Sequence, residues 1–379
     1  MYISNQQLKP DIIIIGAGII GLSIAYHILE ADPQVSITIL EKGKMLGVGS
    51  TGKGTGSIRY PFSSTLLRRL SLLSRDFFLN FESTFDTPID YLEKGCLMLA
   101  THGGLWDQLQ LTTEDAGTDR IPMRLLKQEE LLKFFPYLHR DRFLGGILCP
   151  WDAYADPYAV LAALYAAVRR KGASVHFGRE ATKILIKGDT IEGVETSQGT
   201  ILSHLIVNAA GPYAARFAAT AGVTLPVQPY RRQVYVCTNP KDVPSATPLI
   251  VDMATGFYLH QEASGKVVLL GGTDQNTWPG FDDVVDKSEA ENFFLTAVET
   301  IPSAMDIKWL RTYTGLCEQT PDFHPIIGEA PGLKGFFLAN GFSGNGFMHA
   351  PAAGSIVADL ILKGETEQVD INLFHLDRF

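Results

Sequence analysis

The N-terminal part of the chain alternates between runs of apolar residues and turns. Residues 11–15, DIIII, form a short isoleucine-rich run, which is typical of a parallel strand buried on both faces. From Ile19 the apolar residues recur at helical spacing, and residues 35–40 form a second apolar run. The pattern therefore predicts a strand, a tight turn, a helix and a second strand, which is the beginning of an α/β fold.

Later segments predict elements of both kinds. From Thr182 the sequence reads as three short strands joined by turns, and residues 336–364 read as a strand, a glycine-rich turn and a helix. Residues 158–170 predict an alanine-rich helix, and the apolar residues between positions 66 and 81 recur at helical spacing. We expect this last stripe to face the core rather than a partner.

Three glycines, Gly16, Gly18 and Gly21, mark the first predicted turn. In a dinucleotide-binding turn, such glycines let the chain bend, let the backbone approach a pyrophosphate and let the helix pack on the strand. The helix N-terminus then offers free N–H groups to phosphate. Glu41 ends the second strand about 20 residues later, where a carboxylate can bind the adenosine ribose. The turn predicts a dinucleotide, NAD or FAD, with a purely structural glycine turn as the alternative.

Composition and charge narrow the class of protein. With 379 residues, 46% of them hydrophobic, the chain can form one large or two interleaved domains. A net charge of −9 argues against a nucleic-acid partner. The four cysteines are too scattered for a zinc site or a disulfide framework, so we expect no metal and a reducing cytoplasm. The polar first ten residues predict no secretory signal, and glycines interrupt the opening apolar stretch too early for a transmembrane segment.

Four motifs, taken together and in order, resemble one family. They are GAGIIG, VNAAG, RTYTGLCEQTPDFHPIIG and GFSGNGFMHAPAAG. The set resembles FAD-dependent oxidoreductases of the D-amino-acid oxidase superfamily, most of all the branch of sarcosine oxidase and the L-proline dehydrogenase beta subunit. The resemblance implies a mixed α/β structure with a Rossmann-like FAD-binding domain and a β-meander, formed by residues 1–90, 150–225 and 323–379. Residues 91–149 and 226–322 would form a substrate-binding domain with a mixed, largely antiparallel sheet.

The resemblance also assigns residues to FAD. The glycine-rich run after Glu41 can lie along an extended cofactor, although a flexible surface connection is the alternative. The residues expected to bind the cofactor are Gly16, Gly18, Ile20, Glu41, Lys42, Ser50, Thr51, Lys53, Gly54, Thr55, Gly56, Ala181, Ala210, Gly211, Gly344, Asn345, Gly346, Phe347 and Met348. The cysteine that bonds covalently to flavin in sarcosine oxidases falls at Gly315, two residues from Cys317, so the resemblance implies noncovalent FAD.

On the substrate side, Arg59 matches the arginine that pairs with the substrate carboxylate, and the alternative is a surface arginine with an acidic neighbour. Alternation along GFYLHQE places Tyr258 and His260 on one face of a strand. If that face covers the flavin, His260 accepts a proton from the substrate ammonium and Tyr258 positions the amine; otherwise both belong to an ordinary sheet surface. Met348 replaces a second carboxylate-binding cation, and Leu269 replaces a lysine that promotes reaction with oxygen.

The resemblance implies oxidation of the C–N bond of a small amino acid or N-alkyl amino acid, similar to proline, sarcosine or glycine. A hydride would pass from the α-carbon to flavin N5, and the enzyme would be a dehydrogenase rather than an oxidase. Its electron acceptor would be a quinone, a partner subunit in a hetero-oligomer or oxygen. We expect it in the cytoplasm, or at the membrane surface through the acceptor. An FAD-binding assembly or electron-transfer subunit is the alternative, and an NAD-linked dehydrogenase is a third.

Overall fold

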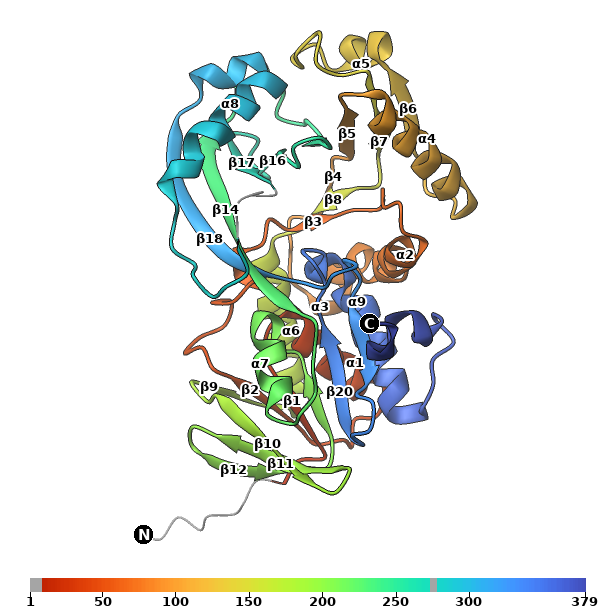
Figure 1. Ribbon diagram of the computed structural model, residues 1–379, viewed down its shortest axis with the longest axis vertical. Coiled ribbons are helices and arrows are strands. Elements are labelled where there is room, and N and C mark those ends of the chain that lie inside the picture. Colours follow the sequence, from red (N-terminus) through yellow and green to blue (C-terminus); the bar gives the residue numbers. More distant parts are fainter. Residues whose placement is uncertain (1–8, 273–277) are drawn as a thin grey trace.

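The structure is a computed structural model that describes residues 9–272 and 278–379 (Figure 1). The prediction that the chain has no secretory signal was based mostly on residues 1–8, which lie outside the described residues. In the orientation of Figure 1, a six-stranded sheet forms the lower half and an eight-stranded sheet the upper half. The mixed α/β fold class predicted from the sequence is confirmed.

The lower half is built on a sheet in which every neighbouring pair is parallel except β19 and β20. In spatial order its strands are β19 (Ile326–Glu329), β20 (Phe336–Asn340), β13 (Ile206–Asn208), β1 (Ile12–Ile15), β2 (Ile37–Glu41) and β9 (Ser174–Phe177). All four isoleucines of β1 are buried, because helices cover one face of the sheet, and a short helix together with the antiparallel strands of residues 181–202 covers the other. The strands predicted at 11–15 and 35–40 are therefore confirmed.

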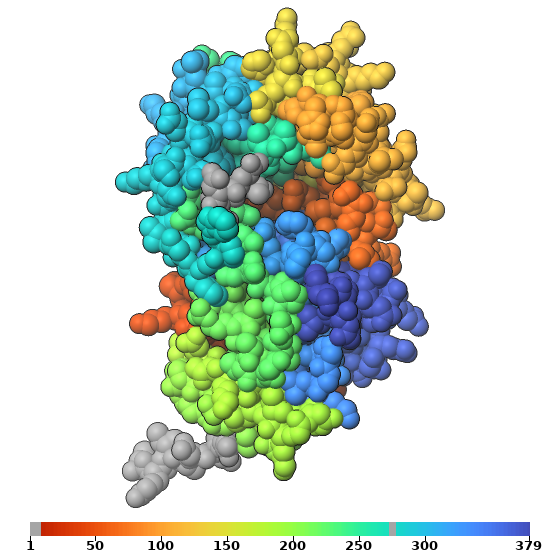
Figure 2. Space-filling model, viewed as in Figure 1, coloured from red at the N-terminus to blue at the C-terminus, as the bar shows by residue number. Residues whose placement is uncertain are grey.

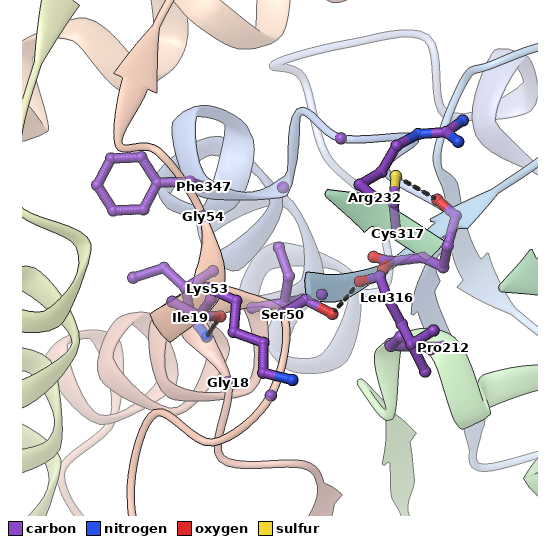
Figure 3. A pocket seen from close by; sticks show the side chains of 18 of the residues that line it. Gly18, Ile19, Ser50, Lys53, Gly54, Pro212, Arg232, Leu316, Cys317 and Phe347 are labelled. Carbon is purple, nitrogen blue, oxygen red and sulfur yellow. Dashed lines mark hydrogen bonds between the residues drawn. The ribbon is translucent and has the colours of Figure 1, made fainter. Parts of the chain in front are cut away.

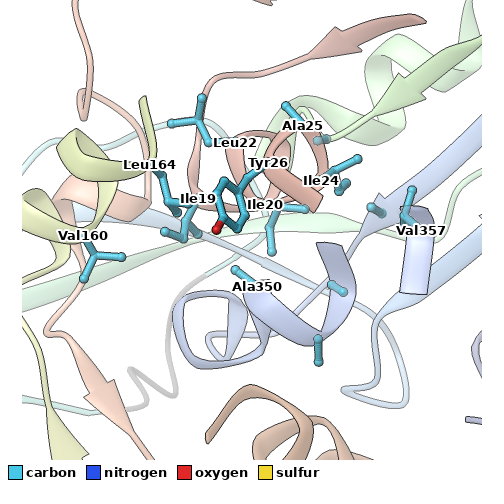
Figure 4. Packing of buried hydrophobic residues seen from close by; sticks show 14 of the residues in the cluster. Ile19, Ile20, Leu22, Ile24, Ala25, Tyr26, Val160, Leu164, Ala350 and Val357 are labelled. Carbon is cyan, nitrogen blue, oxygen red and sulfur yellow. The ribbon is translucent and has the colours of Figure 1, made fainter. Parts of the chain in front are cut away.

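Helix α1 (Ile19–Ala31) packs between two other helices, α6 (Pro157–Arg170) and α9 (Gly346–Lys363) (Figure 4). Gly354 lets α9 approach closely, since a Cβ at this position would lie 2.4 Å from the Ser23 hydroxyl oxygen. That hydroxyl donates a hydrogen bond to the Ala350 carbonyl over 2.8 Å. This packing fixes the N-terminal ends of α1 and α9 relative to the sheet.

A three-stranded antiparallel meander lies at the lower end of the molecule (Figure 1). Its strands are β10 (Ala181–Lys187), β11 (Thr190–Thr196) and β12 (Gly199–Leu202). Gly188 lies in the first turn and Gly199 begins β12 directly after the second, with φ angles of 64° and 100°. These left-handed angles favour glycine, which is why the sequence signalled both turns.

The upper half is built on a sheet in which every neighbouring pair is antiparallel except β15 and β5. In spatial order its strands are β18 (Trp309–Gln319), β14 (Gln228–Thr238), β17 (Val267–Gly271), β16 (Tyr258–Gln261), β15 (Leu249–Asp252), β5 (Cys96–Ala100), β7 (Gly145–Cys149) and β6 (Arg124–Lys127). All of them fall within the ranges 91–149 and 226–322. The boundaries proposed for the two domains stay a prediction.

The two halves are joined by long strands and by a small sheet. Strands β14 and β18 pair along their whole length and run from the upper half into the lower (Figure 1). A three-stranded sheet of β3 (Ser57–Ile58), β8 (Ala153–Tyr154) and β4 (Leu92–Glu93) lies at the same level. The space-filling view shows the halves in contact across the middle of the molecule (Figure 2).

The remaining described helices are α2 (Thr65–Leu79), α3 (Phe81–Phe85), α4 (Gly103–Thr118), α5 (Gln128–Phe134), α7 (Ala214–Ala219) and α8 (Ala290–Thr300). Leu67, Leu70 and Phe78 on α2 and Phe81 on α3 are buried in the core, so the stripe predicted to face inward does so. None of the helices within residues 9–272 and 278–379 combines the length and apolarity needed to cross a membrane.

Candidate active site

A cavity of about 670 Å³ lies between the carboxyl ends of β1, β2 and β13 and residues of β14, β16 and β18. In open α/β sheets, ligands bind at this edge of the parallel strands. Except for Asn345, every residue expected to bind the cofactor lines the cavity. Of the three residues expected at the substrate, Arg59 and Tyr258 line it and His260 does not.

The first glycine turn is too tightly packed for side chains. At Gly16, where φ is 105°, a Cβ would lie 2.4 Å from the Ala209 carbonyl oxygen. Glu41 braces the same turn, since its Oε2 accepts a hydrogen bond from the Ala17 N–H over 3.0 Å and its Oε1 accepts one from the Gly43 N–H over 2.6 Å. An ionised carboxylate has further acceptor capacity, so Glu41 is still able to bind a ribose hydroxyl.

The glycine-rich loop 47–57 lies along the cavity and is tied to both halves (Figure 3). Thr51 Oγ1 accepts a hydrogen bond from the Ile19 N–H at the start of α1, over 3.1 Å. Ser50 Oγ donates to the Leu316 carbonyl of β18 over 2.6 Å. Lys53 pairs with Asp283 at 3.2 Å. These contacts order the loop, which favours a role beside the cofactor over a loose surface connection.

Two helix N-termini open into the cavity. Gly18 precedes α1 and Asn345 precedes α9, and neither of these N-cap residues caps its helix with a side chain, although Thr51 Oγ1 accepts from the first N–H of α1. Free N–H groups and the positive end of a helix dipole favour an anionic ligand. The cavity therefore fits a long, anionic cofactor such as FAD, with both helix termini among its lining residues. Within the described residues, no group of three His, Cys, Asp or Glu side chains could hold a metal ion.

Arg59 follows β3 and is half-buried at the wall of the cavity. One guanidinium nitrogen, Nη2, donates to Asn345 Oδ1 over 3.3 Å, and the Arg59 N–H donates to Met348 Sδ over 3.4 Å. No carboxylate of the described residues forms an ion pair with this guanidinium. The alternative of a surface arginine with an acidic partner therefore has no support, and most of the guanidinium fork is available to an anion.

Tyr258 lies across the backbone of the neighbouring strand. A Cβ on Gly271, which is directly opposite Tyr258, would meet the phenol oxygen at 2.0 Å. The missing side chain of Gly271 thus lets the ring lie flat at the cavity wall. Burial raises the pKa of Tyr258, so its hydroxyl keeps its proton and is a hydrogen-bond donor at neutral pH.

His260 differs from the sequence-based expectation. It shares a strand face with Tyr258, but the small junction sheet covers it: its Nδ1 lies 3.2 Å from Ser57 Oγ, and its ring lies 5.2 Å from that of Tyr154. Only 4% of the residue is exposed, and burial lowers the pKa of His260 to about 4. A direct proton transfer from the substrate to His260 is therefore not supported by its position.

Three residues of the cavity wall were not predicted from the sequence. Arg232 is opposite Gly315 in the β14–β18 pair, and its Nη1 donates to the Arg231 carbonyl over 3.1 Å. Glu318 also lines the wall, and burial raises the pKa of its carboxyl to about 7. Burial likewise raises the pKa of the Cys317 thiol. The sequence did contain one signal for Cys317. Side chains alternate along a strand, so Cys317 lies on the same face of β18 as Gly315, the position assigned to the flavin.

A comparison with known protein families shows which family this chain belongs to. The family model described as "FAD dependent oxidoreductase" matches residues 11–360. The chain belongs to this family. The predicted family and its FAD cofactor are thus confirmed, whereas the noncovalent attachment stays a prediction.

Individual relatives of this FAD-dependent oxidoreductase share most of its length. It is similar to the crystal structure of L-proline dehydrogenase from P. horikoshii, with a TM-score of 0.90, 28% identity and 98% of both chains covered. It is 31% identical to glycine oxidase of Geobacillus kaustophilus, over 98% of this chain and 97% of that protein. It is 27% identical to mitochondrial dimethylglycine dehydrogenase of Homo sapiens, but the match covers 94% of this chain and 43% of that protein. The chain spans less than half of that longer relative.

Proposed function

We propose that this protein is an FAD-dependent dehydrogenase that oxidises the C–N bond of a small amino acid or N-alkyl amino acid. The observation that carries the proposal is Arg59, a guanidinium that lines the cofactor cavity and has no carboxylate partner among the described residues. A guanidinium fork matches a carboxylate in shape and charge. The names of the similar proteins, glycine oxidase, dimethylglycine dehydrogenase and L-proline dehydrogenase, support the same substrate class.

In this proposal the chain mainly binds and orients the substrate. Arg59 holds the carboxylate, and the Tyr258 hydroxyl donates a hydrogen bond beside it. When bound, FAD supplies the two-electron oxidation by accepting the α-hydrogen as hydride. No histidine lines the cavity within the described residues, so we propose that the substrate amine gives its proton to water. The resulting imine then hydrolyses to a keto acid or an aldehyde.

The proposal favours a dehydrogenase over an oxidase. Leu269, the position that matches the oxygen-promoting lysine, is buried against Val234 and Val236. An apolar contact of this kind offers no positive charge to stabilise reduced oxygen. We therefore propose a quinone or a protein subunit as the electron acceptor, with oxygen reacting slowly. Assembly with a partner subunit, a cytoplasmic location and contact with a membrane surface belong to the same proposal.

The test is anaerobic reduction of the FAD-loaded protein by a panel of substrates. We expect glycine, sarcosine, dimethylglycine or proline to bleach the visible flavin absorbance, and the corresponding amines without a carboxylate to bleach it far more slowly. If none of these compounds bleaches the flavin while FAD stays bound, the protein is an assembly or electron-transfer subunit instead. If the protein binds no flavin at all, both proposals are wrong.

A further inference from the structure

Asp152 is a buried carboxyl group directly before strand β8, near Arg59. Strands β3 and β8 are antiparallel, with Ile58 opposite Ala153, and extending this register by one residue beyond both strands places Arg59 opposite Asp152. Asp152 Oδ1 accepts a hydrogen bond from the Tyr60 N–H over 3.2 Å, which ties it to the residue that follows Arg59. Only 2% of Asp152 is exposed, and it does not line the cavity. It therefore lies beside the anion-binding residue without access to substrate.

The surroundings of Asp152 leave its charge poorly compensated. Its Oδ2 is buried and has no hydrogen-bond partner among the described residues. The thiols of Cys96 and Cys149, which are opposite each other in the β5–β7 pair, lie next to it. Burial raises the pKa of Asp152 to about 7, and the Cys149 thiol and the Arg59 guanidinium offset only part of this rise. Near neutral pH the carboxyl is thus divided between its two protonation states.

The other charged or titratable groups around this segment are paired or neutral. Arg75 of α2 stacks on Trp151 with its guanidinium 4.2 Å from the ring centre, and it pairs with Glu93 of β4 at 2.9 Å. His349 of α9 is fully buried, and burial lowers its pKa to about 3. Arg59 is consequently the cation acting on Asp152 whose positive charge an anion in the cavity would neutralise.

We propose that Asp152 is a positioning residue that balances the charge of Arg59 in the empty site and takes up a proton when a substrate carboxylate binds there. The inference rests on the proposed role of Arg59. An anion on the guanidinium removes the positive field that favours the ionised form of Asp152. By linkage, protonation of Asp152 strengthens binding of the anion by the same factor. Ionisation of Asp152 at high pH therefore weakens carboxylate binding.

The test measures binding of propionate, a carboxylate without an amine, to the FAD-loaded protein between about pH 6 and pH 8.5, where propionate itself does not titrate. Binding is followed by the change in flavin absorbance. Calorimetry in buffers with different ionisation enthalpies reports the protons taken up. For the unmodified protein we expect uptake of a fraction of a proton near pH 7.5, and an affinity that falls severalfold toward pH 8.5.

Variants separate Asp152 from the other carboxyl group with a raised pKa. Asp152→Asn should bind propionate severalfold more tightly than the unmodified protein at pH 8.5 and lose the proton uptake. Glu318→Gln should keep both the uptake and the pH dependence. Asp119→Asn, which alters the ion pair with Arg68 away from the cavity, is the matched control for removing a carboxylate paired with arginine and should also keep them.

The outcomes also separate this inference from the proposed function. If propionate binding requires Arg59, as judged with Arg59→Met, but takes up no proton in the unmodified protein, the role of Asp152 is wrong and the role of Arg59 stands. If Arg59→Met binds propionate normally, the assigned substrate site itself is wrong. Should Asp152→Asn fail to fold, the calorimetry of the unmodified protein still decides the matter. Uptake that disappears in Glu318→Gln would contradict the proposal.

Discussion

Arg59 is the residue through which the proposed substrate is recognised. Its guanidinium faces the cavity from the junction of the two halves, held by Asn345 and by the backbone contact with Met348. Tyr258 completes the polar wall, and His260 lies behind the small junction sheet. In this account the side chains of the chain bind and orient the substrate, and the cofactor carries out the oxidation.

Replacing Arg59 with methionine should raise KM for a carboxylated substrate by at least about tenfold, equivalent to about 1.4 kcal/mol. The reason is the loss of the charge-assisted hydrogen bonds to the carboxylate. Steady-state kinetics with an artificial electron acceptor measure the effect. Arg69→Met, on the solvent-facing side of α2, should leave KM unchanged. An unchanged KM in Arg59→Met would remove Arg59 from the site.

The burial of His260 predicts how the free energy of unfolding changes with pH. Burial lowers the pKa of His260 to about 4, so the unfolded chain binds more protons than the folded chain between about pH 6.5 and pH 4. The free energy of unfolding should therefore fall as the pH is lowered through this window, measured by denaturant titration. His260→Gln should make the fall less steep. It should also leave the fall of kcat/KM toward low pH unaltered, whereas loss of that acidic limb would restore the role of His260 as the base.

At the scale of elements, the strand–turn–helix at the N-terminus sets the position of the cofactor. The turn could be predicted from the sequence because its determinants are local: an apolar run, three glycines and a helical repeat. The position of His260 could not. Alternation correctly places it on the face of Tyr258, but the strand pair β3–β8 that covers it comes from segments about 100 and 200 residues away in the chain. Asp152 was missed for the same reason.

Two glycine substitutions test this turn. Gly16→Ala should lower both the thermal stability of the FAD-free protein and its FAD affinity, because the new Cβ would overlap the Ala209 carbonyl. Gly18→Ala should keep the thermal stability but weaken FAD binding, since its Cβ meets only Thr51 Oγ1, at 3.4 Å, and otherwise points into the cavity. Thermal unfolding without FAD and fluorescence titration with FAD measure the two properties. Equal FAD affinity in Gly18→Ala and the unmodified protein would place the pyrophosphate elsewhere.

At the scale of the whole molecule, the cavity joins the two halves. Its walls come from the six-stranded sheet below and from β14, β16 and β18 above (Figures 1 and 3). The resemblance to the family predicted both sheets, because its four motifs occur in the family's order along nearly the whole chain. The extra cation Arg232 was not predicted, because its place at the wall depends on the pairing of β14 with β18.

Removing FAD should destabilise the protein as a unit. At a free FAD concentration about 100 times its Kd, binding should add about 2.7 kcal/mol to the free energy of unfolding. Thermal unfolding with increasing FAD measures the effect, and NAD at the same concentrations is the control. Stabilisation by NAD in place of FAD would contradict the assignment of the cofactor to this cavity.

The most direct test of the proposed chemistry is a single anaerobic turnover with product analysis. The FAD-loaded protein is mixed with an excess of the amino acid or N-alkyl amino acid that bleaches it fastest, and the carbonyl product is quantified. We predict one keto acid or aldehyde for each flavin reduced. Reduced flavin without a carbonyl product, or bound flavin that no such substrate reduces, would contradict C–N oxidation at this site.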